Sequence, residues 1–211
     1  MSTHTSPPRR DWRTATARLL NEALAPSVIV LVLPLTVAWQ ATGAVLPTVL
    51  WSSVVALTSS VLPMGVVVWG SRTGRWDGHH VRDRRGRLIP FITLIVLSML
   101  GLAILISAEA PWPLIALDIG MIVSLFLTGA ITIFWKVSIH SAVAAGATVV
   151  LALTYGALWW LLAVVVAAVS WARVAVEDHT PAQVVGGALT GALVGSGCFA
   201  MLVGNATPIP W

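Results

Sequence analysis

Three polar segments interrupt an otherwise apolar chain, and each carries side chains that could bind or attack a phosphate. They are residues 79–87 (HHVRDRRGR), 136–141 (KVSIHS) and 173–183 (RVAVEDHTPAQ). Guanidinium groups match phosphate oxygens with paired hydrogen bonds, and imidazole suits nucleophilic or acid–base chemistry near neutral pH. No acidic cluster with metal-ligand spacing accompanies them. The residues therefore predict metal-free attack on a phosphate ester, with no cofactor.

The third polar segment contains the predicted start of a helix. Thr180 followed by Pro181 is typical of an N-cap and first helical residue, and Gln183 stands at the capping-box position. His179 would then lie just before a helix N-terminus, where free backbone N–H groups and the helix dipole favour an anion. In the second segment, Ser138 likewise precedes a predicted helix.

At these residues the chain resembles the type-2 phosphatidic acid phosphatase superfamily, which includes vanadium haloperoxidases and glucose-6-phosphatase-like enzymes. Three motifs mark that family: Lys-x6-Arg-Pro, Pro-Ser-Gly-His and Ser-Arg-x5-His-x3-Asp. Arg173-x5-His179-x3-Gln183 reproduces the third spacing, with Gln in the final place and Ala172 in place of Ser. This motif is the most specific of the three.

The other two motifs are matched more loosely. Ser138-x-His140 corresponds to the second motif, whose Pro and Gly are here Val and Ile. His80-x6-Arg87 is the best register for the first, with His for Lys and Leu for the final Pro. The resemblance covers residues 77–195 and is degenerate but consistent in position.

The resemblance implies a role for each matched residue. In the family the third-motif His attacks phosphorus, the second-motif His protonates the leaving oxygen, and the Asp orients the nucleophile. His179 would accordingly be the nucleophile, His140 the general acid and Gln183 the orienting residue. Gln183 can accept the same hydrogen bond from the ring but supplies no charge to stabilise an imidazolium. The implied phosphate-binding residues are Arg173, Arg87 and Ser138, with His80 and Arg84 as further candidates.

The third and second segments also allow simpler interpretations. Arg173 and His179 could be an interfacial pair that anchors a helix end. His140 could be a polar residue at a helix start, and Gln183 could be only a capping residue. The capping and orienting roles of Gln183 are compatible.

The first segment has alternatives of its own. Its additional arginines suit contact with lipid headgroups better than catalysis, and these are Arg82, Arg84 and Arg85. His79, His80 and Asp77 could be imagined as a metal cluster, but adjacent histidines do not converge easily on one ion.

The elements that position these segments are predicted to be transmembrane helices. The chain of 211 residues is 57% hydrophobic and 9% charged, and about twenty apolar residues of helix cross a bilayer. This composition excludes a soluble enzyme, a disordered chain and a nucleic-acid binder, and the net charge of +4 does not indicate a DNA partner. We expect an all-α, polytopic transmembrane helical bundle of about six to seven spans, near residues 26–40, 46–70, 88–107, 112–135, 140–155, 157–173 and 181–203.

Two parts of the chain are distinguished by polarity. Residues 1–22 form a polar N-terminal segment, in which residues 11–20 could lie as a short helix on the membrane surface. No cleavable signal peptide is expected. Residues 23–211 are predicted to form a single transmembrane phosphatase-like domain, in which Cys198 excludes an internal disulfide framework.

The basic residues predict the orientation. All twelve Lys and Arg lie in four places, which seven spans bring to one face: the N-terminal segment, the 71–87 loop, Lys136 and Arg173. The opposite loops contain Glu109 but no Lys or Arg. The positive-inside rule places the basic face, with the three polar segments, on the cytoplasmic side of the cell membrane.

Two further features lie inside the predicted spans. Asp118 falls within the fourth span, where a carboxylate is costly and usually functional unless it lies close enough to the interface to be wet. Gly187, Gly191 and Gly195 recur every fourth residue in the seventh span, which predicts a face for close helix packing.

These expectations combine into a membrane enzyme that dephosphorylates a lipid phosphate or diphosphate within the bilayer. The excess of arginine in the first segment favours an isoprenoid substrate. The alternatives are a non-enzymatic lipid-phosphate binder or transporter on a decayed phosphatase fold, and phosphoryl transfer to an acceptor other than water. The sequence does not indicate an oligomeric state.

Overall fold

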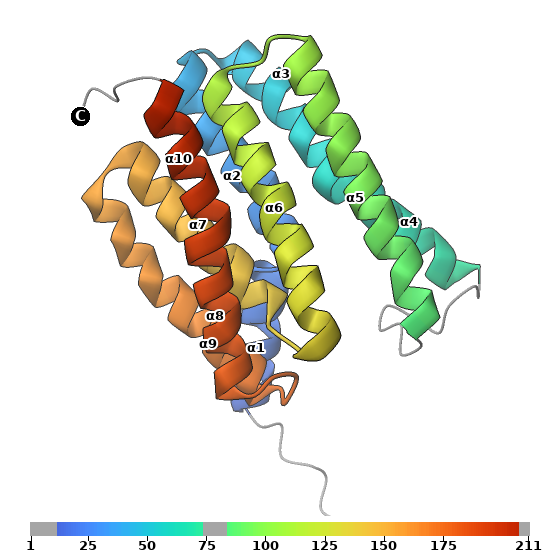
Figure 1. Ribbon diagram of the computed structural model, residues 1–211. Helices are drawn as coiled ribbons and strands as arrows, with labels where there is room; N and C mark the ends of the chain where they lie inside the picture. Colours follow the sequence, from blue (N-terminus) through green and yellow to red (C-terminus); the bar gives the residue numbers. More distant parts are fainter. Residues whose placement is uncertain (1–11, 74–83, 207–211) are drawn as a thin grey trace, which may run out of the picture.

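The computed structural model describes residues 12–73 and 84–206, and the side chains in these ranges except those of residues 84–88 and 206. Its helices run up and down along one bundle axis (Figure 1). They are α1 Trp12–Ala23, α2 Pro26–Thr42, α3 Val45–Ala56, α4 Leu62–Arg72, α5 Arg84–Ser107, α6 Trp112–Phe134, α7 Ile139–Tyr155, α8 Ala163–Ala175, α9 Pro181–Thr190 and α10 Ser196–Ala206. Two π-helical turns, η1 Leu57–Val61 and η3 Gly191–Gly195, and a 3₁₀ helix, η2 Ala157–Leu162, join some of them.

The predicted all-α transmembrane bundle is confirmed. Five helical segments in the described residues are long and apolar enough to cross a membrane, and a sixth is reached if α1 and α2, bent by 42°, form one span. The remaining apolar helix is α7, which has 17 residues. Each of the seven apolar stretches predicted from the sequence therefore corresponds to a helical segment, and the protein is a multi-pass membrane protein.

The predicted short helix in the N-terminal segment is present as α1. It packs against α8 at one end of the bundle. This end also carries the connections from α6 to α7 and from α8 to α9, and it is the lower end in Figure 1. We call it the basic end because its described cations are Arg13, Arg18, Arg72, Lys136 and Arg173.

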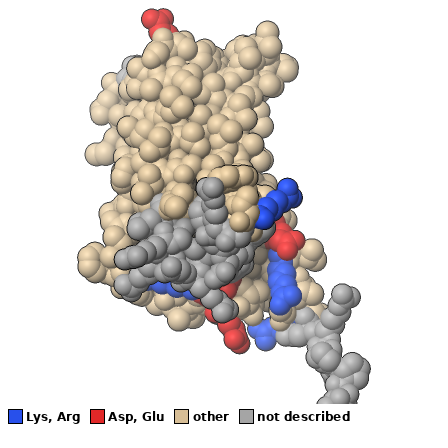
Figure 2. Space-filling view, turned by 90° about the vertical axis from the view of Figure 1, so that its right-hand side faces the viewer, with Lys and Arg blue, Asp and Glu red and all other residues tan. Residues whose placement is uncertain are grey.

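The surface between the two ends is apolar. Figure 2 shows charged side chains gathered at the basic end below a wide uncharged surface. On α5, for example, Ile92, Val96 and Ile106 are exposed, as expected for side chains that face lipid. The connection from α5 to α6 at the opposite end contains Glu109, which has φ of 53°.

The glycines of the seventh predicted span pack closely against neighbouring helices, as predicted. A Cβ at Gly187 would collide with the backbone of Ser138, and one at Gly191 would collide with the backbone of Ala142. Gly195 lies against Ser124 and the carbonyl of Gly120 in α6. Contacts this close bring α9 and η3 against the start of α7 and against α6.

The turn between the fifth and sixth predicted spans is tight. Helix α7 ends at Tyr155, and Gly156 follows with φ of 99°, a conformation that side chains disfavour. The next residues, Ala157–Leu162, form the 3₁₀ helix η2 before α8 begins. The predicted sixth span thus starts as 3₁₀ rather than α-helix.

Candidate active site

Two connections at the basic end are held together by hydrogen bonds. The backbone N–H of Ser138, between α6 and α7, donates to the carbonyl of Gln183 in the first turn of α9 at 3.1 Å. The Lys136 Nζ donates to the backbone carbonyl of Asp178 at 2.7 Å. These bonds bring together the second and third polar segments. Lys136 and Asp178 are 42 residues apart in the sequence.

The two histidines of these segments lie close enough for the charge of one to affect the other. His140 is in the first turn of α7, and His179 lies just before Thr180, the N-cap of α9. His140 interacts electrostatically with both His179 and Arg173. The structure therefore brings together the three residues that the sequence predicted as general acid, nucleophile and phosphate-binding cation.

Burial lowers the pKa of His179 below its ordinary value. The positive charges of Arg173 and Lys136 lower this pKa further, whereas a backbone hydrogen bond with Val137 and the charge of Asp178 act in the opposite direction. The lowered pKa favours neutral imidazole near neutral pH. A neutral ring keeps the lone pair that nucleophilic attack requires.

Arg173 is held at the C-terminal end of α8 by the loop that follows. Its Nη2 pairs with Asp178 Oδ2 at 2.9 Å, and its backbone carbonyl accepts the N–H groups of Asp178 and His179 at 3.2 and 3.3 Å. Its Nε is buried and has no hydrogen-bond partner among the residues that the structure describes. The guanidinium thus retains a donor that an anion could use.

The predicted helix cap at Thr180 is confirmed. Thr180 Oγ1 accepts the N–H of Gln183 at 3.4 Å, and Gln183 Oε1 accepts the N–H of Thr180 at 3.0 Å. These two bonds form a capping box. His179 Nδ1 is buried without a hydrogen-bond partner within the described part of the chain. Gln183 Oε1 thus caps the helix in this structure, and an orienting role toward His179 stays a prediction.

Ser138 also acts as a helix cap. It is the N-cap of α7, its side chain is fully buried, and its Oγ accepts from the N–H and the hydroxyl of Ser141 at 3.3 and 3.2 Å. Ser141 in turn accepts from Ser170 Oγ of α8 at 3.1 Å. This chain of hydroxyls ties α7 to α8, and phosphate binding by Ser138 stays a prediction.

The first polar segment is only partly described. His80 lies outside the described residues, as do Asp77, His79 and Arg82. Arg84, Arg85 and Arg87 lie in the first turn of α5, but their side chains are outside the described set. Figure 1 shows that α5 begins at the basic end of the bundle. The role of these residues at the site therefore stays a prediction.

Two residues of the site were not singled out from the sequence. Lys136 bonds to the 176–180 loop and lowers the pKa of His179, and Asp178 pairs with Arg173. Both stood within the polar segments, Lys136 two residues before Ser138 and Asp178 directly before His179. The signal that could have identified them is an opposite pair of charges flanking the two histidines.

Asp118 lies in the protein interior and not in water. Its side chain is 0% exposed in α6, and neither carboxylate oxygen has a hydrogen-bond partner among the described residues. Its sequence neighbours Leu114 and Leu117 belong to the apolar core. The carboxylate is therefore enclosed by protein and not exposed on the surface of the bundle.

One comparison with known proteins agrees with the resemblance seen in the motifs. Residues 121–206 match the family model described as the PAP2 superfamily. The matched range contains α7, α8 and α9 with both polar segments that meet at the basic end, and it excludes residues 79–87. No curated protein matches the chain, and no solved structure matches it.

Proposed function

From a membrane phosphatase-like fold whose residues 121–206 match the PAP2 superfamily, we propose that this protein hydrolyses a phosphate or diphosphate monoester of a membrane lipid. One observation carries the proposal. His140, His179 and Arg173 come from three different helix ends and interact with one another at the basic end. Two imidazoles and a guanidinium are the groups that metal-independent phosphoryl transfer through histidine needs.

The reaction proceeds in two steps. A ring nitrogen of neutral His179 attacks phosphorus, the bond from phosphorus to the leaving oxygen breaks, and His140 gives its proton to that oxygen. Water then attacks the phosphohistidine, His140 takes a proton from the water, and inorganic phosphate leaves with the electron pair of the P–N bond returned to His179. Bound phosphate adds negative charge beside His140 and so favours its protonated form.

The phosphate oxygens are held by cations. The ion pair with Asp178 already orients the Arg173 guanidinium, and its buried Nε offers a further donor. We assign Arg87 to the same role, with Arg84 and His80 as additional donors from the first polar segment. Substrate binding then requires Arg173 to share its charge between Asp178 and the phosphate.

We further propose that the substrate is an isoprenoid diphosphate or monophosphate. The candidate site lies at the ends of membrane-spanning helices, so the reactive phosphate would lie at headgroup depth while its tail stays between helices. Residues 82–87 carry more positive charge than one monoester needs, and each extra cation near a diphosphate adds charge-assisted hydrogen bonds. The distribution of Lys and Arg supports a cytoplasmic basic end in the cell membrane.

The decisive experiment measures phosphate release from purified protein. Prenyl diphosphate, prenyl monophosphate, phosphatidic acid and phosphatidylglycerol phosphate are compared in one detergent, with kcat/KM expected to fall in that order. His179→Ala should abolish turnover, because the covalent route needs its nitrogen. The matched control is His4→Ala, since His4 is the histidine outside the three polar segments. Wild-type rates in His179→Ala would refute the mechanism, and a preference for phosphatidic acid would refute the isoprenoid assignment.

One observation favours a second candidate, a lipid-phosphate binder without turnover. Gln183 is engaged in the capping box, and His179 Nδ1 has no partner in the described residues. A nucleophilic imidazole normally has its second nitrogen fixed by a carboxylate, whereas the ring of His179 has a backbone hydrogen bond with Val137. Saturable binding of prenyl phosphate without phosphate release would select this candidate. Product formation only with added alcohol acceptors would select phosphoryl transfer.

A further inference from the structure

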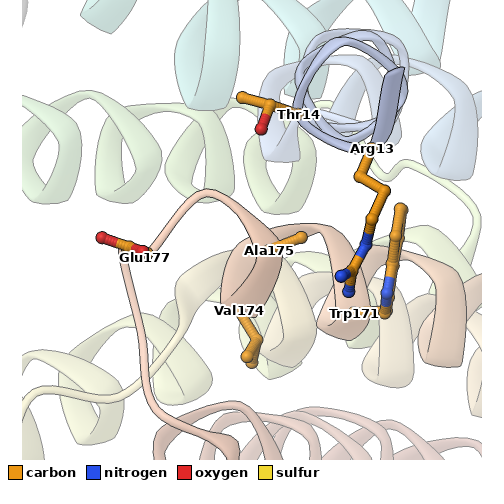
Figure 3. A pocket seen from close by; sticks show the side chains of 6 residues that line it. All are labelled: Arg13, Thr14, Trp171, Val174, Ala175 and Glu177. Carbon is orange, nitrogen blue, oxygen red and sulfur yellow. The ribbon is translucent and has the colours of Figure 1, made fainter. Parts of the chain in front are cut away.

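A polar cavity lies on the flank of the bundle, between α1 and the end of α8. Its volume is about 380 Å³, and its lining residues are Arg13, Thr14, Trp171, Val174, Ala175 and Glu177 (Figure 3). This lining contains neither His140 nor His179. Pockets of about 300–1,000 Å³ are the usual size for small ligands, so the cavity can hold a compact polar group separate from the candidate active site.

The depth of this cavity is set by the elements that form it. Trp171, Val174 and Ala175 belong to the last part of the membrane-spanning segment Ala157–Ala175, and Glu177 follows that segment directly. The other wall is α1, which packs against α8. Tryptophan at the end of a span marks the membrane–water interface. The cavity therefore opens at the depth of lipid headgroups.

The lining offers two opposite charges. Figure 3 shows the Arg13 guanidinium beside the Trp171 indole on one side of the cavity, with Glu177 on the other side. Thr14 adds a hydroxyl from α1. Arginine and a hydroxyl suit phosphate oxygens, and a carboxylate suits an ammonium group. A ligand that carries phosphate and ammonium has one group complementary to each of these charges.

We propose that this cavity binds the headgroup of a zwitterionic phospholipid with a primary ammonium group, the phosphoethanolamine type. The phosphate is bound by Arg13 and Thr14, and the ammonium is bound by Glu177. A primary ammonium has three N–H donors for the carboxylate, whereas a quaternary ammonium has none. The bound lipid is an accessory ligand and not the substrate.

The test measures which lipids remain bound to the purified protein. The protein is equilibrated with equal amounts of phosphatidylethanolamine, phosphatidylcholine and phosphatidylglycerol that share the same acyl chains, and native mass spectrometry counts the retained lipids. Wild type should retain phosphatidylethanolamine preferentially. Arg13→Gln should weaken retention of phosphatidylethanolamine about tenfold, the loss expected for one hydrogen bond to a charged group.

Two further variants separate the two halves of the headgroup. Glu177→Gln should abolish the preference for phosphatidylethanolamine over phosphatidylglycerol while leaving a phosphate contact. Arg18→Gln is the matched control, because Arg18 is exposed on the same helix and does not line the cavity. It should keep the wild-type preference.

Three results would overturn the proposal. Equal retention of the three lipids by wild type would show that the cavity does not select a headgroup. An unchanged preference in Glu177→Gln, with an unaltered melting temperature, would remove the ammonium contact. Binding of soluble O-phosphoethanolamine as tightly as the lipid would show that the ligand comes from water and not from the bilayer.

Discussion

Two pairs of helices in this bundle use small residues in different ways. Where α9 and η3 cross α7, glycine meets backbone: Gly187 lies against Ser138, and Gly191 lies against Ala142. Where α5 crosses η1, Gly101 instead faces the side chain of Thr58. A side chain can shift away from a new neighbour, whereas a backbone carbonyl inside a helix cannot. The Thr58 hydroxyl would lose its hydrogen bond to the Val54 carbonyl in doing so.

This difference coincides with the candidate chemistry. The crossing of α7 with α9 lies within residues 121–206 and places Ser138 next to Gln183, and with them the two histidine-bearing segments. The crossing of α5 with η1 contains a hydrogen bond between Ser59 and Ser98 hydroxyls at 3.2 Å and no residue of the candidate site. Contacts of glycine with backbone are thus found where the connection from α6 to α7 meets the start of α9, next to the two histidines.

The largest expected effect separates the two regions by activity. His140→Ala should slow turnover about 10²–10⁴-fold, since it removes the acid that protonates the leaving oxygen. The loss should be smaller with a diphosphate than with a monophosphate substrate, because a phosphate leaving group needs less protonation than an alkoxide. Ser98→Ala, in the other region, should leave kcat near the wild-type value. Equal losses of kcat in His140→Ala and Ser98→Ala would contradict the separation of a catalytic from a structural region.

The next effect separates the regions by stability. Gly191→Ala should lower the free energy of unfolding by about 3 kcal/mol, because its methyl group would collide with the backbone of Ala142. Gly101→Ala should cost less, because the Thr58 side chain can move with the loss of one hydrogen bond, which contributes about 1 kcal/mol. Denaturant unfolding in detergent measures both values, and a larger loss for Gly101→Ala would contradict the comparison.

A smaller effect is expected at Gln183, whose side chain closes the capping box. Gln183→Ala should lower the free energy of unfolding by about 1 kcal/mol through loss of that cap. Gln183→Asp should keep the helix start, since acidic residues are favourable there, and raise kcat by placing negative charge behind His179. An unchanged kcat in both Gln183→Ala and Gln183→Asp would confine residue 183 to capping.

The smallest effect concerns pH. Because the pKa of His179 is lowered, the acid limb of kcat/KM should lie below the ordinary histidine value of about 6.5. Lys136→Gln removes a positive charge that lowers this pKa, so the pKa rises and the limb moves to higher pH by a few tenths of a unit. Arg72→Gln, at the same end of the bundle but outside the site, is the control. A shift to lower pH would contradict the assignment.

Much of the fold could be predicted because its determinants are local. Apolar stretches of the right length identified the helical segments that follow α1, and spacing of four identified the packing face of Gly187 and Gly191. Thr180 and Gln183 identified a helix start because a capping box involves residues three apart. Each of these signals is complete within a short window of sequence.

The parts of the site that could not be predicted depend on distant residues. The bond from Lys136 to Asp178 joins segments 42 residues apart, and no local pattern specifies it. The burial of Ser138 follows from the close approach of Gly187, which only the packed structure reveals. Sequence reasoning assigned Ser138 by its motif, whereas its hydroxyl belongs to a chain that includes Ser170 of a neighbouring helix.

The π-helical turn η3 has a consequence for how the last segment tolerates changes in length. One residue of an α-helix corresponds to a rotation of about 100° around its axis. Deleting one residue within Gly191–Gly195 would remove the extra residue of the π-turn and leave regular α-helix, with α10 in nearly its present rotation relative to α9. The same number of residues wound as regular α-helix would instead rotate Phe199 and Val203, now buried in the apolar core, by about 100°. The π-turn thus sets how α10, which completes the core, is rotated about the helix axis relative to α9, which carries the helix cap.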